Sequence, residues 1–455
     1  MTASPSTLII PVEIQVREMD AKILLSCVAA ERGFPVVMGS RAFIHFQADS
    51  IPRGVYLAKS MRTLSIRMFS ILYELGHAIV AYDEEALVRA PDYEYYRWRL
   101  APETVSRVSH LLAWGEDDAQ VLRAYPGYAG APIHVTGNPR IDLMRADVRE
   151  FYRPEVDTLR QRFGDFVLVN TNFNKVNHFF AELSDLKNAA QAEDGAPAHP
   201  FEAGKGRHKL VLFQHFREMV PALCQSLPGH TVVLRPHPAE SHDPWLELAA
   251  RCPNLRVVNE GNVVPWLMAA RALIANSCTT MVEAAILGVP ALNFEPVTSE
   301  EYDYQLPNSL SHSATTVAAL CEAVGAMVRG ELGPIEELRR KAVLERHLAA
   351  LDGPLAADRM VDVLVGAGYR DHQPPRSPLY RYARGWLRNR IRSAKKRGNM
   401  HRPGHRNNIV YHAHRFPDIS VAEVRARVER LGRVLHRFQG VRVESYGEHT
   451  FRFNA

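Results

Sequence analysis

Short apolar segments alternate with longer amphipathic segments along most of this chain, in two successive series. In the first series, helical patterns at 19–31 and 63–75 lie among strand-like runs at 7–12, 35–38, 54–57, 77–82, 111–114 and 133–136. Strands that alternate with helices at this spacing form a parallel, doubly wound sheet. The turn sequence Gly137-Asn138-Pro139 closes the series. We therefore predict a Rossmann-like α/β domain over residues 1–155.

The second series predicts another Rossmann-like domain over residues 156–370. Its strand-like runs are 166–170, 231–234, 256–258, 272–275 and 290–294, and helical patterns at 317–329 and 335–349 close it. A further helix is expected near 209–220, where Pro221 would end or kink it. Residues 189–206 are polar and unpatterned, which predicts a loop. A chain of 455 residues is too long for one hydrophobic core. We place the boundary near 148–160.

The net charge of +5 arises from one segment. Residues 376–406 carry eleven Lys and Arg and no Asp or Glu, so the rest of the chain has a net charge of 5 − 11 = −6. Apolar side chains recur there at helical spacing, opposite the arginines: Leu379, Tyr382, Trp386, Leu387 and Ile391. We predict a basic amphipathic helix within 371–406. It would bind an anionic inner-membrane surface or pack back on the N-terminal domain with its arginines in solvent. We expect no nucleic-acid partner, because no nucleic-acid fold signature accompanies the cations.

Residues 407–455 predict a small α+β module. Residues 408–416 are strand-like, and Ser420 with Glu423 forms a capping-box signature that begins a helix to about residue 438. Two short strands at 441–446 and 450–453 follow. The sequence of this module does not indicate a function.

The sequence favours a cytoplasmic location. Its longest apolar runs are interrupted by polar residues and fall short of the ~20 residues of a spanning helix. The first residues have no basic region of the kind that opens a signal peptide. The five cysteines are dispersed, which argues for reduced thiols. A peripheral position on the inner membrane would follow if the basic segment binds lipid.

Two motifs of the second series are suited to phosphate. Arg235 and His237 follow the strand at 231–234, and Pro238 with the proline before the histidine fixes the direction of the imidazole. Such a histidine can donate a hydrogen bond or a proton to a phosphate oxygen. Hydroxyl groups also gather at an expected helix N-terminus, which is an anion site, although simple capping of the helix is an alternative. These hydroxyls belong to Ser277, Thr279 and Thr280.

Other polar residues follow neighbouring strands of the second series. Glu260 comes after the strand at 256–258, where a carboxylate can accept hydrogen bonds from ribose hydroxyls or simply precede a turn at Gly261. Asn172 and Asn174 follow the strand at 166–170. Because the carboxyl ends of parallel strands share one edge, we expect these residues at one crevice.

In the first series, acidic residues follow a strand. Asp83, Glu84 and Glu85 come after the strand at 78–82, where a carboxylate can take a proton from an acceptor hydroxyl. Adjacent carboxylates also suit Mg²⁺, but no acidic ligand beyond this triplet is near, so we predict no metal site. Glu13 and Arg17 follow the first strand and are expected to line the acceptor side.

These motifs resemble those of a known group. LIIPVE, GHAIVAYDEEAL, VTGNPRIDL, VNTNFN, RPHPAE and SCTTMVEAAILGVP look like the bacterial surface carbohydrate biosynthesis proteins, over roughly residues 7–320. Their order also resembles the GT-B glycosyltransferases that use CMP-activated sialic acids and related 2-keto sugars. The resemblance implies a GT-B fold, in which two Rossmann-like domains face a cleft.

The resemblance implies a role for each matching residue. Asp83 or Glu84 would be the general base, and the glutamate at position 85, where the family has glycine, leaves that choice open. His237 would contact the CMP phosphate, Glu260 the ribose, and the two threonines the phosphate. The implied reaction is an inverting, metal-independent transfer of 3-deoxy-manno-octulosonate (Kdo) or a nonulosonate. Its acceptor would be a surface polysaccharide or glycolipid, and no cofactor beyond the CMP-sugar co-substrate is expected.

Two alternatives stay open. A transferase or epimerase-like enzyme with a UDP- or CDP-linked donor would share the fold. A diphosphate would call for more cations or a metal around Thr279, where the sequence offers only Arg235 and Arg271. A catalytically inactive scaffold is the alternative outside enzymes.

Overall fold

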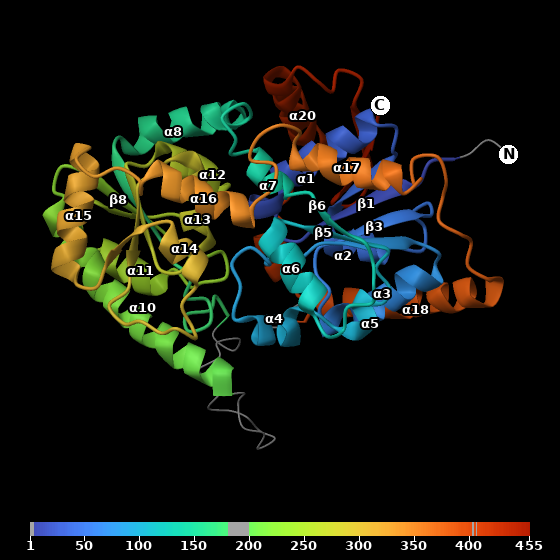
Figure 1. Cartoon of the computed structure of the whole chain (residues 1–455), viewed down its shortest axis with the longest axis horizontal. Coiled ribbons are helices and arrows are strands. Elements are labelled where there is room, and N and C mark those ends of the chain that lie inside the picture. Colours follow the sequence, from blue (N-terminus) through green and yellow to red (C-terminus); the bar gives the residue numbers. More distant parts are fainter. Residues whose placement is uncertain (1–3, 181–199, 403–404, 406) are drawn as a thin grey trace. The chain divides into compact units, whose positions relative to one another are not determined.

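The computed structural model describes residues 4–180, 200–402, 405 and 407–455, and it divides the chain into two units. The first unit combines Met1–Phe151 with Glu345–Ala455, and the second holds Tyr152–Leu344. The chain thus leaves the first unit once and returns to it (Figure 1). We expected the second domain to run on to residue 370, whereas residues 345–370 belong to the first unit.

The first unit is built on a doubly wound sheet, as predicted. Its strands are β1 Thr7–Val12, β2 Val36–Ser40, β3 Gly54–Ala58, β4 Ala78–Ala81, β5 His110–Ala113, β6 Ile133–Val135, β13 Arg442–Gly447 and β14 Thr450–Asn454. They lie in the order β13-β14-β2-β1-β3-β4-β5-β6, and β1 to β6 are parallel. The strand order reverses beside β1, so the carboxyl ends of β1 and β3 flank the place where such sheets bind ligands.

The helices of the first unit lie on the faces of this sheet. They are α1 Gln15–Glu31, α2 Arg41–Phe46, η1 Thr63–Ser65, α3 Ile66–Glu74, α4 Asp92–Arg99, α5 Pro102–Val105, α6 Glu116–Ala124, α7 Pro139–Asp142, α17 Ala356–Gly366, α18 Leu379–Met400, α19 Ile409–Arg415 and α20 Val421–Leu435. The 3₁₀ turn η2 Arg149–Tyr152 leads out of the unit. Helix α18 confirms the helix expected in the basic segment.

The returning chain is anchored to the first unit at α17. The carboxylate of Asp142 accepts hydrogen bonds from the backbone N–H groups of Ala356 (2.8 Å) and Ala357 (2.9 Å). A carboxylate at a helix N-terminus satisfies free donors and opposes the helix dipole. Arg32 on α1 pairs with Asp362 on α17, and the two helices lie side by side (Figure 1). These contacts explain why the second unit ends before residue 370.

The C-terminal residues differ from prediction in one element. The strand expected at 408–416 is wrong, because residues Ile409–Arg415 form helix α19. The Asn408 side chain accepts a hydrogen bond from the Val410 N–H (2.8 Å), which caps the helix. The capping box of Ser420 and Glu423 is confirmed at the start of α20.

The two predicted C-terminal strands are confirmed, but they extend the first sheet, so residues 407–455 belong to the first unit and are not a separate module. Strand β14 pairs antiparallel with β2, and β13 pairs with β14. Gly39 permits this pairing, because a Cβ there would lie 2.3 Å from the backbone oxygen of His449. The hairpin therefore covers the edge that β2 would otherwise expose.

The second unit has a parallel sheet in the order β12-β11-β10-β7-β8-β9. Its strands are β7 Phe166–Asn170, β8 Thr231–Arg235, β9 Leu255–Val257, β10 Ala272–Ala275, β11 Ala291–Phe294 and β12 His312–Ala314, the last of which we did not predict. Its helices are α8 Arg153–Phe163, α10 Pro200–Ser226, α11 Asp243–Ala249, α12 Val263–Ala269, α13 Thr279–Leu287, α14 Gln305–Ser309, α15 Val317–Arg329 and α16 Glu337–His347. The strand order reverses between β7 and β10.

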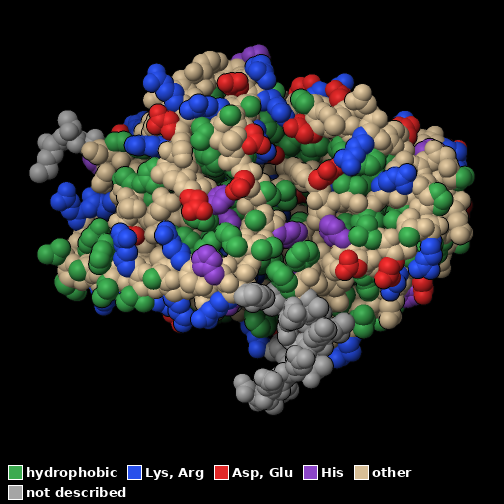
Figure 2. Space-filling model, turned by 180° about the vertical axis from the view of Figure 1, so that it is seen from behind, with side chains coloured by type: hydrophobic (Ala, Val, Ile, Leu, Met, Phe, Trp, Pro, Cys, Tyr) green, Lys and Arg blue, Asp and Glu red, His purple; other side chains and the backbone are tan. Residues whose placement is uncertain are grey.

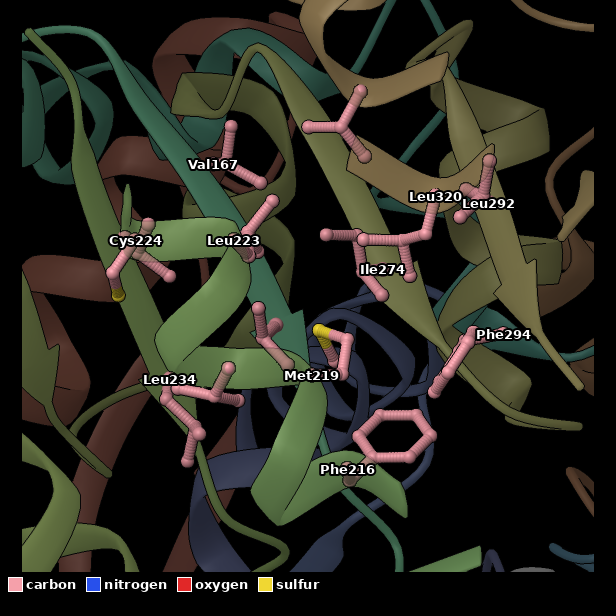
Figure 3. Packing of buried hydrophobic residues seen from close by; sticks show 14 of the residues in the cluster. Val167, Phe216, Met219, Leu223, Cys224, Leu234, Ile274, Leu292, Phe294 and Leu320 are labelled. Carbon is pink, nitrogen blue, oxygen red and sulfur yellow. The ribbon is translucent and has the colours of Figure 1, made fainter. Parts of the chain in front are cut away.

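Helix α10 is longer than predicted. The helix expected to end or kink at Pro221 continues to Ser226, and residues 200–206, expected in a loop, are its first two turns. The remainder of that expected loop, 189–199, lies outside the described residues. Met219 and Leu223 are buried on either side of the proline against the sheet (Figure 3). This packing offsets the hydrogen bond that a proline removes from a helix.

Two further findings concern the cysteines and the hydropathy of the helices. The five cysteines are free thiols, as expected. Within the ranges that the structure describes, none of the helices combines the length and the hydropathy that crossing a bilayer requires.

Candidate functional site

The carboxyl ends of β7, β8 and β10 carry most of the predicted residues of the second unit. Asn170 ends β7 opposite Arg235 at the end of β8, and β10 leads directly into Asn276 and Ser277. Asn172 donates from its side chain to the backbone oxygen of Asn276 (2.9 Å), which joins the loops after β7 and β10. The structure therefore brings these three loops to the point where the strand order reverses. Asn174 follows in the first of them and is half-buried.

Asn170 is a polar residue that our sequence analysis did not single out. Its side chain is 5% exposed, and neither its oxygen nor its nitrogen has a hydrogen-bond partner among the residues described. A buried amide without partners is unfavourable by about 1–3 kcal/mol per group. At the end of the central strand, this arrangement indicates a place for a polar ligand.

Lys209 on α10 lies beneath the same loops. Its ammonium group donates to Oδ1 of Asn172 (3.2 Å) and Oδ1 of Asn276 (3.1 Å), and its side chain is buried. Burial, together with the nearby charge of Lys205, lowers the pKa of Lys209 to about 8. Lys205 lies one turn earlier and donates to the Tyr304 hydroxyl (2.6 Å). Two cations thus converge near a group of amides.

The spacing of these two lysines in the sequence could have identified them. They are four residues apart on a helix whose buried face includes Leu212 and Phe216. Residues three, four or seven apart lie on one helix face, so both lysines point towards the sheet.

The N-terminus of α13 has no side-chain cap. Its capping position is Cys278, which has extended backbone and makes no capping hydrogen bond, so simple capping by a hydroxyl does not occur. Thr279 and Thr280 form the first turn and are half-buried, and Thr280 donates to the Cys278 sulfur (3.2 Å). Burial raises the pKa of Cys278, and Lys209 is one of the groups that oppose this shift. The uncapped helix end thus lies near a buried cation.

Ser277 shapes the turn before α13. Its φ of +44° lies in the left-handed region, which is unfavourable for a residue with a side chain. Its hydroxyl donates to Asn308 Oδ1 (3.2 Å) and accepts from the Tyr304 N–H (3.2 Å), and the residue is buried. The hydroxyl is therefore directed into the protein, and the two threonines are the more exposed hydroxyls.

His237 has a defined ring orientation, as the flanking prolines led us to expect. Its Nδ1 accepts a hydrogen bond from the Ala239 N–H (3.1 Å). In the neutral ring the proton is therefore on Nε2, which is then the donor. His237 and Pro238 are both half-buried.

Glu240 joins the loops after β7 and β8. The fully buried carboxylate accepts hydrogen bonds from the N–H groups of Phe173 (2.7 Å) and His237 (3.1 Å) and from the Thr171 hydroxyl (2.9 Å). Burial raises the pKa of Glu240 to about 7, while the hydrogen bonds oppose this shift. This residue positions the His237 loop, and our sequence analysis gave it no role.

Arg235 and Glu260 make contacts other than those expected. The buried Arg235 guanidinium donates to the backbone oxygens of Glu260 (2.6 Å) and Gly261 (3.1 Å) and stacks over Trp266. It therefore holds the loop after β9. The Glu260 carboxylate pairs with Arg162 on α8, and both side chains are about half exposed.

In the first unit, the acidic residues lie in a dense network of ion pairs. Glu13 follows β1 and pairs with Arg41 (2.9 Å), Lys59 (3.3 Å) and Arg415. Arg17 instead pairs with Glu85 (2.8 Å). Lys59 directly follows β3, so this network lies where the strand order of the first sheet reverses.

Both predicted bases are paired with cations. Each carboxylate oxygen of Asp83 accepts from Arg99, one of them at 2.8 Å from Nε. Glu84 is buried, accepts from the Tyr82 hydroxyl (2.8 Å) and pairs with Lys22 (3.5 Å). Burial alone would raise the pKa of Glu84, but the cations, Lys22 foremost, hold it at about 2. The sequence pattern did not reveal these cationic partners.

Comparison with known proteins gives the fold. No family model matches the chain, and no curated protein matches it in sequence. Among solved structures, the wall teichoic acid polymerase TagF, in a crystal soaked with CDPG, aligns with a TM-score of 0.50 at 12% identity, over 80% of this chain and 89% of TagF. A Listeria monocytogenes protein assigned as a UDP-N-acetylglucosamine 2-epimerase aligns with a TM-score of 0.50 at 12% identity, over 83% of this chain and 100% of that protein.

The chain has the GT-B fold. Each unit has the doubly wound sheet that this fold requires, so the fold class that we predicted is confirmed. Among the residues that the structure describes, no cluster of three or more His, Cys, Asp or Glu side chains is arranged to hold a metal ion.

Proposed function

We propose that this chain is a glycosyltransferase of surface polysaccharide synthesis, and that its second unit binds a nucleotide-activated donor. One observation carries the proposal: the buried Lys209 lies with Asn172 and Asn276 beside the uncapped N-terminus of α13. Helix N-termini and lysine ammonium groups both bind phosphate. The acceptor would be a glycan or a glycolipid.

The donor is, in this proposal, a nucleoside diphosphate sugar or polyol, with UDP or CDP as the nucleotide. The sequence offered two arginines near Thr279, whereas Lys205 and Lys209 add two buried cations from α10. A diphosphate carries more negative charge than a monophosphate and needs more cations to offset it. The similarity to TagF soaked with CDPG and to a protein assigned as a UDP-N-acetylglucosamine 2-epimerase is in line with a diphosphate.

A CMP-linked 2-keto sugar, Kdo or a nonulosonate, is the second candidate. The order of the acidic, His-Pro and paired-threonine motifs supports it. A monophosphate leaving group needs fewer cations, so this donor would leave Lys205 and Lys209 without a direct role.

The residues of the second unit have distinct roles in the proposed mechanism. The first N–H groups of α13, Lys209 and the Nε2–H of His237 would stabilise the charge that develops on the departing phosphate. Asn170 would supply its unused amide to the donor. Glu260 would leave Arg162 to accept hydrogen bonds from the ribose, which is feasible because an exposed ion pair contributes at most about 1 kcal/mol.

Asp83 is the proposed general base of the first unit. Glu84 is less suited, because Lys22 and the other nearby cations lower its pKa to about 2, which makes its carboxylate a weak base. Arg99 pairs with both oxygens of Asp83, so base catalysis requires that Arg99 turns away when the acceptor binds. Glu13 and Arg17 would line the acceptor side, and their ion pairs would hold their side chains in place. Transfer would proceed in one inverting displacement without a metal.

Calorimetry with UDP, CDP, GDP, UMP and CMP, each with and without Mg²⁺, tests the proposal. We expect metal-free binding of UDP or CDP that is weakened by 10- to 100-fold in Lys209→Met. Preference for CMP with no effect of Lys209→Met would replace the diphosphate by the CMP-sugar. If no nucleotide binds, the result would contradict a transferase function and favour a catalytically inactive scaffold.

A further inference from the structure

Helix α18 is attached to the first unit through its polar face. Gly385, Asn389 and Arg392 are buried, and Asn389 donates to Asp49 Oδ1 (2.9 Å). Arg388 donates to Glu74 at the end of α3 (2.6 Å). At Gly385 the helices touch so closely that a Cβ would lie 2.7 Å from that of Glu74. The attachment therefore rests on hydrogen bonds, ion pairs and close backbone contact.

The opposite face of α18 is apolar and exposed. Tyr380, Leu387 and Ile391 are 69%, 53% and 56% exposed, and Ala383 and Ala394 are exposed as well. These residues are three or four positions apart, so they form one line along the helix, here called the outer ridge. A surface helix usually buries its apolar face, and α18 does the reverse.

Basic side chains flank the outer ridge on both sides. At about 100° per residue, Arg384 and Lys395 lie on one side of the ridge and Arg390 and Arg397 on the other. Arg384 and Arg390 remain 60% and 59% exposed although they pair with Glu74 and Asp49. The segment 376–406 contains eleven cations and no acid, so a positive excess remains around the ridge. Green and blue side chains intermix in Figure 2 at the lower left, where α18 lies.

We propose that the outer ridge and its flanking cations bind the surface of an anionic lipid bilayer. The helix would lie in the plane of the membrane, with the ridge in the acyl boundary and the cations at the lipid phosphates. A second copy of this chain would place like charges together. A nucleic acid would pair with the cations but leave Leu387 and Ile391 in water. This inference does not depend on the nucleotide site.

Flotation of the full-length chain with vesicles tests the inference. We expect binding to phosphatidylcholine vesicles that contain phosphatidylglycerol, and little binding to phosphatidylcholine alone. Leu387→Ser and Ile391→Ser should each weaken binding about tenfold, since each removes an apolar side chain from the lipid. Lys395→Gln should weaken it about fivefold and reduce its salt dependence. These side chains are exposed, so circular dichroism should be unchanged.

The second unit offers a matched control variant. Leu338 on α16 is 76% exposed in the second unit, so Leu338→Ser should leave vesicle binding unchanged. Equal binding to neutral vesicles, or binding that the ridge variants do not change, would overturn the proposal. Oligonucleotide binding that exceeds vesicle binding and ignores the ridge variants would point to nucleic acid. Self-association without lipid that Leu387→Ser abolishes would assign the ridge to a second copy.

Discussion

The ammonium group of Lys209 donates a hydrogen bond to Oδ1 of Asn276 (3.1 Å), a residue 67 positions further along the chain. The contact links helix α10 to the loop that precedes α13. It places a buried cation at the point where the strand order of the second sheet reverses. The proposed donor site depends more on this relationship than on any single sequence motif.

Replacing Lys209 with methionine should weaken the binding of a nucleoside diphosphate by 10- to 100-fold. A hydrogen bond to a charged group contributes about 1.5–3 kcal/mol, and 1.4 kcal/mol is about tenfold in affinity. Calorimetry with UDP and CDP measures the effect. Lys341→Met on the exposed surface of α16 is the control and should bind as the unchanged chain does. Equal losses in both variants would speak against a specific contact.

Nucleotide binding should weaken as the pH rises above 8. Burial lowers the pKa of Lys209 to about 8, and a bound phosphate would raise it again. Binding then takes up a proton, so affinity should fall by about tenfold per pH unit above that pKa, until the pKa of the complex is reached. Calorimetry between pH 7 and pH 10 tests this dependence, and the slope should vanish in Lys209→Met. A pH-independent affinity in the unchanged chain would contradict the assignment.

Substitution of His237 with alanine should reduce turnover by about 10²–10⁴-fold, the usual contribution of a positioned acid. The Nδ1 contact with Ala239 leaves Nε2 as the donor, which alanine removes. His230 precedes β8 at the opposite end of the strand, so His230→Ala is a matched control with little expected effect. Steady-state kinetics with the donor identified by calorimetry measures both variants. Similar activity of the two would remove His237 from the mechanism.

The variant Asp83→Asn should lose turnover by about 10²–10⁴-fold while its nucleotide affinity stays unchanged. The reason is that Asp83 lies in the first unit, whereas the proposed donor site is in the second. Glu116→Gln removes an exposed carboxylate from α6 of the same unit and should retain most activity. Full activity of Asp83→Asn would transfer the role of base to another residue.

Glu84→Gln should destabilise the first unit by about 3 kcal/mol, because it leaves Lys22 buried without its carboxylate partner. The pKa of Glu84 is lowered to about 2, so its contribution to stability is complete above the unfolded pKa and declines as the pH falls towards 2. Urea unfolding at several pH values measures both effects. Glu116→Gln, at an exposed pair with Arg123, is the control and should change stability by less than about 1 kcal/mol. Equal stability of the two variants would contradict a structural role for Glu84.

Local sequence patterns predicted most strands of both sheets, although not β12, and also the loops that carry polar residues. Apolar periodicities of about 2 and 3.6 residues distinguish strands from helices, and parallel strands place the loops after them at one edge. Asn172, His237 and Thr279 could therefore be assigned to a common edge before the structure was known. Helix α19, Ile409–Arg415, was missed, because a run of so few residues shows too little periodicity to distinguish a helix from a strand.

Long-range packing sets which side chains that are far apart in the sequence come into contact. It brought Lys209 under the loop of Asn276, paired Asp83 with Arg99, and left the amide of Asn170 unpartnered. It also turned the apolar face of α18 outward, since Glu74 and Asp49 offer carboxylates to the polar face. Such contacts depend on how distant elements pack against each other. Local sequence patterns specify the face of a helix but not the surface that the face will contact.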